Sequence, residues 1–483
     1  MKRQRYGFLR RMVVGALIAA CLSASPAVLS AESMDSKAAD RDLVQELIEK
    51  YHVSGLESEA LAGKSVDEML EKLNDPHTNY FTKEDYASFQ SMLNRDFVGI
   101  GIQLEEVKEG LLIVEVYAGT EAEAAGIREG DIIVAVEGSR VAGQKYDELT
   151  GVLLGPENSV LNVEIEREGN RKAYAIKRKT IVLPVVTGQL FDGQTGYIKV
   201  ATFSEDADER FQDELNKLKK AGMTSLIVDL RDNPGGLVDT AQNIAKAFIE
   251  NGVLIHMLDR DKNDKPVFVE GGSALPLPVY FLVNEFSASA SEVLTGFVQD
   301  YKLAKVIGKK TYGKGSVQSI FGLTSGGMLK LTIEQYLTPN YRVVDHKGLQ
   351  PDTEVEGNLP QLIEALHQTG ITEITLERTP TQVTIDRVKR EELMSVVVEN
   401  GKTYVPARVL AALIGGTVGW NAEYSSVDVK AAKAAASYTE KDRTLILKDG
   451  TGYIELGAFT RAFPQLAWGG EGERISIFAR KAG

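Results

Sequence analysis

The feature that most constrains the fold of this chain is an apolar run, residues 278–283 (PVYFLV), followed at once by a serine-rich segment, residues 284–292 (NEFSASASE). A short continuous apolar run is typical of a buried strand, and residues 293–298 (VLTGFV) are again apolar. The pattern predicts a strand that turns directly into a helix. A serine in such a turn has its hydroxyl at the tip of a sheet and at the positive end of a helix, where developing negative charge is stabilised. We therefore predict Ser289 as a nucleophile.

Serines at the start of a helix also serve as ordinary N-caps, and the serine run alone favours that interpretation. We expect Ser287 and Ser291 to be caps or neighbours of the nucleophile.

A second segment, residues 311–318 (TYGKGSVQ), changes the balance because it places Lys314 between two glycines ahead of an alternating run. A solvated lysine has a pKa of about 10.4, but burial against apolar groups lowers the pKa by several units. Lys314 would then accept the proton of Ser289. A neutral amide orients an amine without raising its pKa, and Gln318 fits because residues 314, 316 and 318 would share one face of an extended strand.

The two motifs together, SASASE and, 25 residues after Ser289, the lysine of GKGSVQ, resemble the active-site signature of the carboxyl-terminal processing peptidases, also called tail-specific proteases. The resemblance covers roughly residues 40–355. It implies that Ser289 is the nucleophile, Lys314 the general base and Gln318 the residue that orients the base. Ser-Lys variants of the serine-hydrolase triad are known. The resemblance implies no metal and no cofactor.

Composition bounds the class of protein. The 483 residues suffice for three or four domains, and 43% hydrophobic and 25% charged residues are typical of a globular chain. The net charge of −13 argues against a nucleic-acid partner. Five histidines and one cysteine argue against a histidine-based metal site and a disulfide framework.

Residues 1–31 resemble a secretory signal, because basic residues precede a short apolar core and then small residues. The single cysteine, Cys21, follows Ile18-Ala-Ala20, which resembles a bacterial lipobox. Cleavage there would tether the mature protein through lipid on Cys21, whereas cleavage near Ala31 would release it; an uncleaved anchor is a third alternative. Each predicts an exported, extracytoplasmic bacterial protein, either secreted or associated with the membrane.

Residues 40–95 show helical periodicity, with stripes that include Leu43, Leu47 and Ile48, then Val66 and Met69. A link rich in turn residues, LNDPHTNYFT, ends this region and resembles a segment of the family. An arm outside the catalytic core must bury its apolar face. Pairing of two subunits, giving a homodimer, is one hypothesis, and packing on the same chain is the other.

Residues 96–180 alternate as short strands around AEAAGIREGD and resemble a PDZ domain. PDZ domains hold an extended peptide as an added strand and bind its terminal carboxylate on backbone amides. The resemblance assigns this role to a loop and the strand that follows it: Val98, Gly99, Ile100, Gly101 and Ile102. It also suggests that Arg167 reports PDZ occupancy to the catalytic domain, although a strand-end arginine is usually solvated.

Residues 181–375 are predicted to form the catalytic domain. Residues 195–200 and 225–230 read as strands with a helix between them, and the β-α-β alternation places an active site at the strand ends. The glycines of DLRDNPGG expose backbone amides, although the segment alone is also a simple turn. By analogy with the family, the oxyanion hole combines the amide of Gly235 or Gly236 with that of Ala290. His346, in the segment VVDHKGLQPD, is discounted as a base because a serine paired with a lysine needs no histidine.

Residues 376–483 lie outside the peptidase resemblance and contain two similar halves. A tyrosine precedes a tryptophan by 16 residues in the first half (Tyr404, Trp420) and by 15 in the second (Tyr453, Trp468). Each half predicts a strand, a short helix and a second strand. The region resembles the copper amine oxidase N-terminal domain, without a copper site, since no histidine or cysteine follows Gln368. Attachment to the cell wall, extra packing and oligomer contacts remain alternatives, and residues 430–440 are predicted to be an exposed linker or loop.

The predicted fold is thus multidomain, α/β and β: a helical N-terminal arm, a PDZ domain, an α/β serine peptidase core of ββα type and a small α+β repeat domain. The leading functional hypothesis is an exported serine endopeptidase that binds unstructured C-terminal tails of protein substrates and cleaves them. A PDZ scaffold with a degenerate peptidase fold is the alternative from another class. An amidase that uses a Ser-Lys pair is a third.

Overall fold

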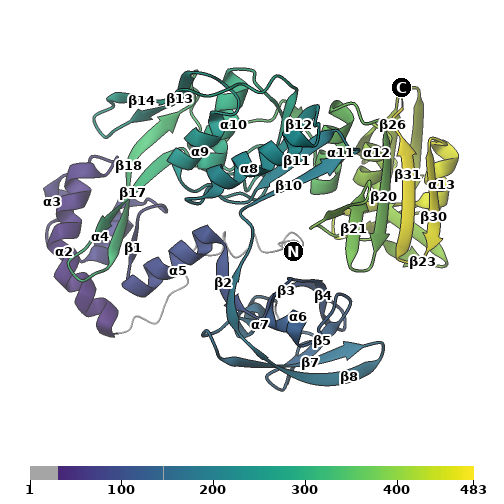
Figure 1. Cartoon of the computed structure of the whole chain (residues 1–483), viewed down its shortest axis with the longest axis horizontal. Helices are drawn as coiled ribbons and strands as arrows, with labels where there is room; N and C mark the ends of the chain where they lie inside the picture. The colour runs from purple at the N-terminus through teal and green to yellow at the C-terminus, as the bar shows by residue number, and fades with distance from the viewer. Residues whose placement is uncertain (1–30, 145, 483) are drawn as a thin grey trace.

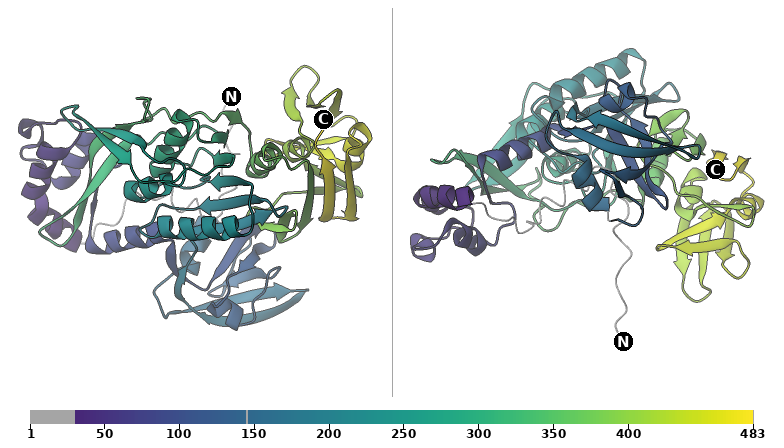
Figure 2. Two further views of the ribbon diagram at one scale, coloured as in Figure 1. Left: turned by 45° about the horizontal axis from the view of Figure 1, so that its top comes forward. Right: turned by 90° about the horizontal axis from the view of Figure 1, so that it is seen from below.

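The computed structural model of this chain describes residues 31–144 and 146–482. The predicted signal lies outside this part except for Ala31, and Cys21 lies outside it altogether. Within the described part, no helix is both long and apolar enough to cross a membrane. The arm of helices and the C-terminal domain occupy opposite ends of the long axis, and a small β domain projects from the middle (Figures 1 and 2).

The N-terminal arm packs on a sheet of its own chain. Its elements are α2 (Ala31–Tyr51), α3 (Ser58–Leu61), α4 (Val66–Leu73), β1 (Asn79–Phe81) and α5 (Lys83–Asn94). The predicted stripes are confirmed, because Ile48 and Met69 are fully buried in a cluster with Leu329 and Leu331 of β18. Strand β1 extends the sheet by pairing with β18, with Asn79 opposite Lys330. Packing on the same chain is therefore observed, and the homodimer remains a prediction.

The small β domain is one twisted sheet with two short helices. Its elements are β3 (Ile102–Val107), β4 (Gly110–Val116), α6 (Glu121–Ala124), β5 (Ile132–Val136), β6 (Ser139–Arg140), α7 (Tyr146–Leu153), β7 (Val160–Arg167) and β8 (Asn170–Lys177). The strand order is β3-β4-β5-β7-β8, with β6 beside β5. Strand β3 thus lies at the edge of its sheet, which is the position that a peptide can extend by β-addition.

A two-stranded ribbon joins this domain to the rest of the molecule. Strand β2 (Asp96–Gly99) pairs antiparallel with β9 (Lys179–Val182) and forms the stalk seen in Figure 1. Farther along the chain, Lys389 of the C-terminal domain forms an ion pair with Glu129 of the β domain at 2.8 Å. The β domain is therefore held from two sides.

The catalytic core is built on a six-stranded sheet of order β10-β11-β12-β15-β16-β19, parallel except for β10. The strands are β10 (Val186–Phe191), β11 (Thr195–Val200), β12 (Ser225–Asp229), β15 (Val279–Val283), β16 (Lys305–Gly308) and β19 (Thr353–Glu354), and the helices are α8 (Ala207–Lys220), α9 (Val238–Ala245), α10 (Ala290–Asp300) and α11 (Asn358–Gln368). The predicted strand-to-helix turn is confirmed between β15 and α10. One face of the sheet packs against α8, α9 and α10, and the other against α11 and the C-terminal domain.

A second, antiparallel sheet carries the other predicted motif. It contains β1, β13 (Gly252–Leu258), β14 (Asp264–Val269), β17 (Ser316–Gly322) and β18 (Met328–Leu337), with β17 and β18 paired over their length. Because Lys314 lies two residues before β17, the predicted base and nucleophile are carried by different sheets.

The C-terminal domain contains two strand-helix-strand halves, which confirms the repeat predicted from the sequence. The halves are β24 (Lys402–Pro406), α12 (Ala407–Leu413) and β25 (Thr417–Asn421), then β29 (Thr451–Glu455), α13 (Leu456–Ala462) and β30 (Leu466–Glu471). Their first strands pair antiparallel, with Val405 opposite Ile454. The remaining strands are β20 (Glu373–Thr379), β21 (Gln382–Ile385), β22 (Val388–Arg390), β23 (Val397–Glu399), β26 (Ser426–Ala431), β27 (Ala434–Thr439), β28 (Leu445–Lys448) and β31 (Arg474–Arg480).

The prediction of a linker or loop for residues 430–440 is wrong, although most of these residues are exposed as expected. Strands β26 and β27 form a tight antiparallel hairpin there, and Tyr438 is only 3% exposed. Alanine and lysine have weak strand propensity, but the packing of Tyr438 against Phe459 decides the conformation, as tertiary context commonly does for strands.

Candidate active site

Ser289 occupies a sharp turn immediately before α10. Its backbone lies at φ 55° and ψ −116°, a region that costs a residue other than glycine about 1–3 kcal/mol. Its carbonyl accepts hydrogen bonds from the amides of Glu292 (2.7 Å) and Val293 (2.9 Å) and from the hydroxyl of Tyr336 (3.2 Å). The helix and the neighbouring sheet thus hold the turn, and the half-buried side chain remains accessible to solvent.

The two flanking serines fix the turn to the loop after β12. The Ser287 hydroxyl donates to the carbonyl of Leu230 at 2.7 Å, and the Ser291 hydroxyl donates to the carbonyl of Asn233 at 2.9 Å. They are neighbours of Ser289 rather than helix caps, which was one of the two expectations.

The loop after β12 brings its two glycines against the nucleophile. A Cβ at Gly235, which lies at φ 106°, would come within 2.7 Å of the Ser289 Cβ, so only glycine allows this approach. The Gly235 amide already donates to the Asn233 side-chain oxygen at 2.8 Å. In the described part of the chain, the amides of Gly236 and Ala290 have no such partner. This geometry favours Gly236 over Gly235 as a donor to an oxyanion.

Lys314 lies half-buried in the loop that leads into β17. Burial lowers the pKa of its amine to about 8, with a further contribution from the positive charge of Lys330. A pKa near 8 provides an appreciable fraction of neutral amine close to neutral pH, as a general base requires. Among the described residues, no hydrogen bond joins the Lys314 amine to the Ser289 hydroxyl. Such contacts often tighten only when substrate binds.

Glu292 links the two predicted motifs and was missed by the sequence reasoning. Its carboxylate is fully buried and accepts four hydrogen bonds: from the amides of Ser289 (3.0 Å), Gly313 (2.7 Å) and Lys314 (2.8 Å) and from the hydroxyl of Thr311 (2.5 Å). Burial raises its pKa, and these hydrogen bonds oppose the rise. The available signal was its position, three residues after Ser289, where an acidic residue completes a capping box.

Gln318 makes contacts different from those expected. Its amide nitrogen donates to the hydroxyls of Ser316 (2.9 Å) and Thr332 (3.2 Å). The register of β17 against β18 shifts between Val317 and Gln318, so simple alternation along the strand does not describe this segment. In the described structure no hydrogen bond joins Gln318 to Lys314. The orienting role of Gln318 stays a prediction.

The arm supports the strand that holds Gln318. The hydroxyl of Thr78 accepts from the amide of Thr332 at 3.1 Å, and Asp75 accepts from that same hydroxyl at 2.6 Å. Next to them, burial lowers the pKa of His77 to about 4, and the charge of Lys314 contributes. The turn-rich link of the arm is therefore part of the surroundings of the base.

The residues assigned to peptide binding divide into two groups. Val98 and Gly99 belong to the β2–β9 ribbon, where Gly99 lies opposite Lys179. Ile100 and Gly101 form the loop, and Ile102 begins the edge strand β3. Gly101 lies at φ 88°, and a Cβ there would come within 2.4 Å of Thr120. The loop and the edge strand thus have the expected arrangement, and the first two residues serve the stalk.

Arg167 points into its own domain. Its guanidinium donates to both carboxylate oxygens of Asp131 (2.6 and 2.7 Å) and to the carbonyl of Gly126 (2.8 Å). These contacts fix the end of β7, and a regulatory role of Arg167 stays a prediction.

His346, which was discounted as a base, is exposed over 88% of its side chain.

Comparison with known families assigns three regions of the chain. Residues 194–355 match peptidase family S41, residues 112–167 match the PDZ domain, and residues 384–462 match the copper amine oxidase N-terminal domain. These matches confirm the resemblances stated from the motifs.

Individual relatives match 65% of the chain. A "probable CtpA-like serine protease" of Staphylococcus aureus (strain N315) is 34% identical over 316 residues, which are 65% of this chain and 64% of the relative. A protein of Staphylococcus epidermidis with the same description is 33% identical over 318 residues, with the same coverage. The match thus spans less than two thirds of either relative. A solved photosystem II D1 C-terminal processing protease is 24% identical with a TM-score of 0.46, covering 68% of this chain and 94% of that one.

Proposed function

We propose that this chain, whose residues 194–355 match peptidase family S41, is a serine endopeptidase. In this proposal it binds C-terminal tails of protein substrates and cleaves them. The observation that carries the proposal is the shared carboxylate of Glu292, which joins the backbone of Ser289 to that of Lys314. A chain that only bound peptides would have no need for this link between a strained serine and a lysine of lowered pKa.

In the proposed reaction the neutral amine of Lys314 accepts the proton of the Ser289 hydroxyl while the Ser289 oxygen attacks the peptide carbonyl carbon. The amides of Gly236 and Ala290 stabilise the oxyanion. Lys314 then returns the proton to the leaving amine, and water hydrolyses the acyl-enzyme by the same route. Gln318, two residues into β17, holds the lysine through its side-chain oxygen when substrate is bound.

The PDZ domain supplies selection by chain end. The edge position of β3 and the loop at Ile100 and Gly101 support binding of an extended tail whose carboxylate meets backbone amides. Export, with Cys21 lipidated or the signal removed, and homodimers formed through the arm are further parts of the proposal that rest on the sequence.

The proposed base sets a pH dependence. Only the neutral amine of Lys314 accepts a proton. We therefore expect kcat/KM to increase with pH, with a midpoint near pH 8, and to be low at more acidic pH, where the amine is protonated. Lys330→Met removes the like charge that helps to lower this pKa, so the midpoint should move to higher pH. The measurement is kcat/KM against pH for both proteins. An unmoved or lower midpoint in the variant would contradict the assignment of Lys314.

The central experiment is a digest of an unfolded protein that carries either a free or an amidated C-terminus. We expect the enzyme to cleave the free form faster, because amidation removes the carboxylate that the PDZ loop binds, and we expect Ser289→Ala to cleave neither. Cleavage that survives in Ser289→Ala would refute the nucleophile. Equal cleavage of both substrates would refute tail recognition while leaving the peptidase intact, and tail binding without cleavage would favour the PDZ scaffold.

A further inference from the structure

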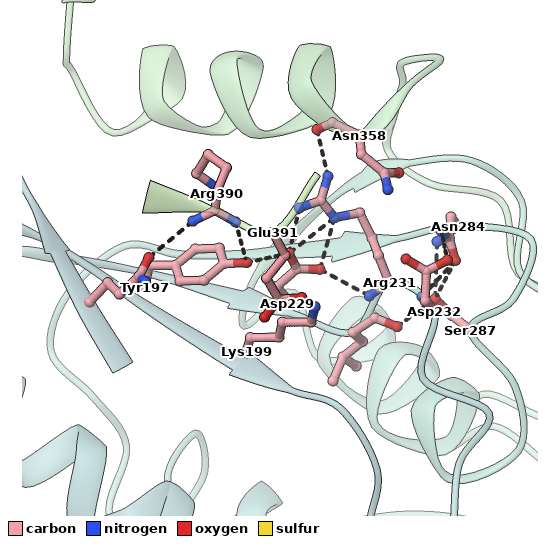
Figure 3. A network of polar contacts seen from close by, with 12 residues as sticks. Tyr197, Lys199, Asp229, Arg231, Asp232, Asn284, Ser287, Asn358, Arg390 and Glu391 are labelled. Atoms are coloured by element: carbon pink, nitrogen blue, oxygen red, sulfur yellow. Dashed lines mark hydrogen bonds and ion pairs between the residues drawn. The ribbon is translucent and has the colours of Figure 1, made fainter. Parts of the chain in front are cut away.

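Arg390 of β22, a buried arginine of the C-terminal domain, contacts the sheet of the catalytic core. Its side chain is 5% exposed and lies over the ring of Tyr197 on β11, with 4.8 Å from the guanidinium carbon to the ring centroid. One guanidinium nitrogen donates to the Tyr197 hydroxyl at 3.0 Å and another to the side-chain oxygen of Gln189 at 3.0 Å. Figure 3 shows Arg390 beside Tyr197.

Tyr197 relays the contact to the end of β12. It is 2% exposed, and its hydroxyl donates to Asp229 at 2.6 Å. A guanidinium has donors only, so the hydroxyl must accept from Arg390 and direct its own proton to the carboxylate. The ionised carboxylate of Asp229 also accepts only, so both contacts require the same orientation of the Tyr197 hydroxyl, and Arg390 helps to fix its position.

Asp229 in turn fixes the start of the loop that carries the glycines. One of its oxygens accepts a hydrogen bond from the backbone amide of Arg231 at 2.9 Å. Both oxygens also accept hydrogen bonds from the Arg231 guanidinium. Burial disfavours the charged carboxylate, but the Arg231 guanidinium outweighs it and lowers the pKa of Asp229 to about 2. The opposite side of Arg231 donates to the carbonyl of Asn358 at the start of α11.

The next residues connect this loop to the nucleophile turn. The Asp232 amide donates to the Asn284 side-chain oxygen at 3.0 Å, and the Asn284 side chain donates back to Asp232 at 2.9 Å. The backbone amide of Asn284 donates a hydrogen bond to the hydroxyl of Ser287 at 3.0 Å (Figure 3). An unbroken series of hydrogen bonds and short backbone segments therefore runs from Arg390 to the turn that carries Ser289.

We propose that Arg390 is a positioning residue: through Tyr197 and Asp229 it holds residues 230–236, and with them the amide of Gly236, against Ser289. This inference rests on the proposed function. The appended repeat domain then does more than cover the open face of the sheet, because it supplies one end of the network that orients the oxyanion hole. Beside it, Glu391 forms an ion pair with Lys199 of β11, which anchors the same segment.

The test combines Arg390→Met, Tyr197→Phe and the double variant with a matched control, Arg378→Met. Arg378 is a buried arginine of the same domain, 7% exposed, that donates to the carbonyl of Met394 and to Glu473, both within residues 376–483. We expect Arg390→Met and Tyr197→Phe each to lower kcat by about 10- to 100-fold with little change in KM, because small displacements of catalytic groups have effects of that size. The double variant should lose no more than the worse single variant, since both break one series of contacts. Arg378→Met should keep its kcat.

A second measurement does not depend on turnover. In the Ser289→Ala background, amide hydrogen exchange of residues 230–236 should become faster with Arg390→Met and with Tyr197→Phe, and should stay unchanged with Arg378→Met. Tyr197→Phe keeps the ring and removes only the hydroxyl, so it preserves the test if Arg390→Met does not fold. Unchanged kcat in the two variants would overturn the proposal, whatever the exchange shows, and so would faster exchange with the control. Failure of the wild-type enzyme to cleave any substrate would instead refute the proposed function, while the exchange data would still report on the network.

Discussion

Replacing Lys314 by alanine is expected to lower kcat/KM by about 10⁴-fold, at the upper end of what a general base contributes. Lys314→Arg should be equally inactive, because arginine keeps the positive charge but cannot lose its proton in this pH range. Affinity for a tail peptide, measured by fluorescence anisotropy, should be unchanged in both variants because the PDZ domain is untouched.

The matched control for this prediction is Lys310→Ala. Lys310 lies four residues before Lys314 and is exposed, so its removal should leave kcat/KM near the wild-type value. Near-normal turnover in Lys314→Ala would exclude the lysine as the base. Activity in Lys314→Arg would show that the charge, and not proton transfer, matters.

Replacing Glu292 by alanine is expected to be the most destabilising substitution in the site. Four donors that now share its carboxylate would lose their acceptor, two of them buried and two partly buried, and each buried donor without a partner costs about 1–3 kcal/mol. The sum is a large fraction of the roughly 5–15 kcal/mol that stabilises an ordinary domain. Denaturant unfolding measures the loss directly.

Glu292→Gln keeps the volume and one acceptor oxygen, so it separates positioning from stability. Its amide nitrogen must face either the amides of Ser289 and Lys314, which share one carboxylate oxygen, or the donors of Thr311 and Gly313, which share the other. Either orientation should displace a segment that holds Ser289 or Lys314 and lower kcat more than KM. Glu285→Gln is the control, because Glu285 is exposed and pairs only with Lys309 among the described residues. A stable Glu292→Gln with wild-type kcat would refute the linking role of the carboxylate.

Sequence reasoning succeeded where the relevant interactions are local. The apolar run and the serines predicted the β15–α10 turn, and the spacing of tyrosine and tryptophan predicted the two strand-helix-strand halves. It failed for the hairpin at residues 430–440, where Tyr438 is buried by a partner distant in sequence, Phe459. It did not predict the β2–β9 pairing that places Val98 and Gly99 in the stalk, because alternation along a strand does not reveal which strand will pair with it.

By itself the sequence determined which elements form and which residues have the chemistry: a serine at the start of a helix, a lysine between glycines and a strand after a glycine loop. Only the tertiary structure decided how these groups are held. Glu292 joins segments about 20 residues apart, and Arg390 bonds to Tyr197 across 193 positions. The physical reason is that periodicity and turn chemistry are properties of a short stretch of chain, whereas the acceptor that satisfies a buried donor is chosen by the packing of whole domains.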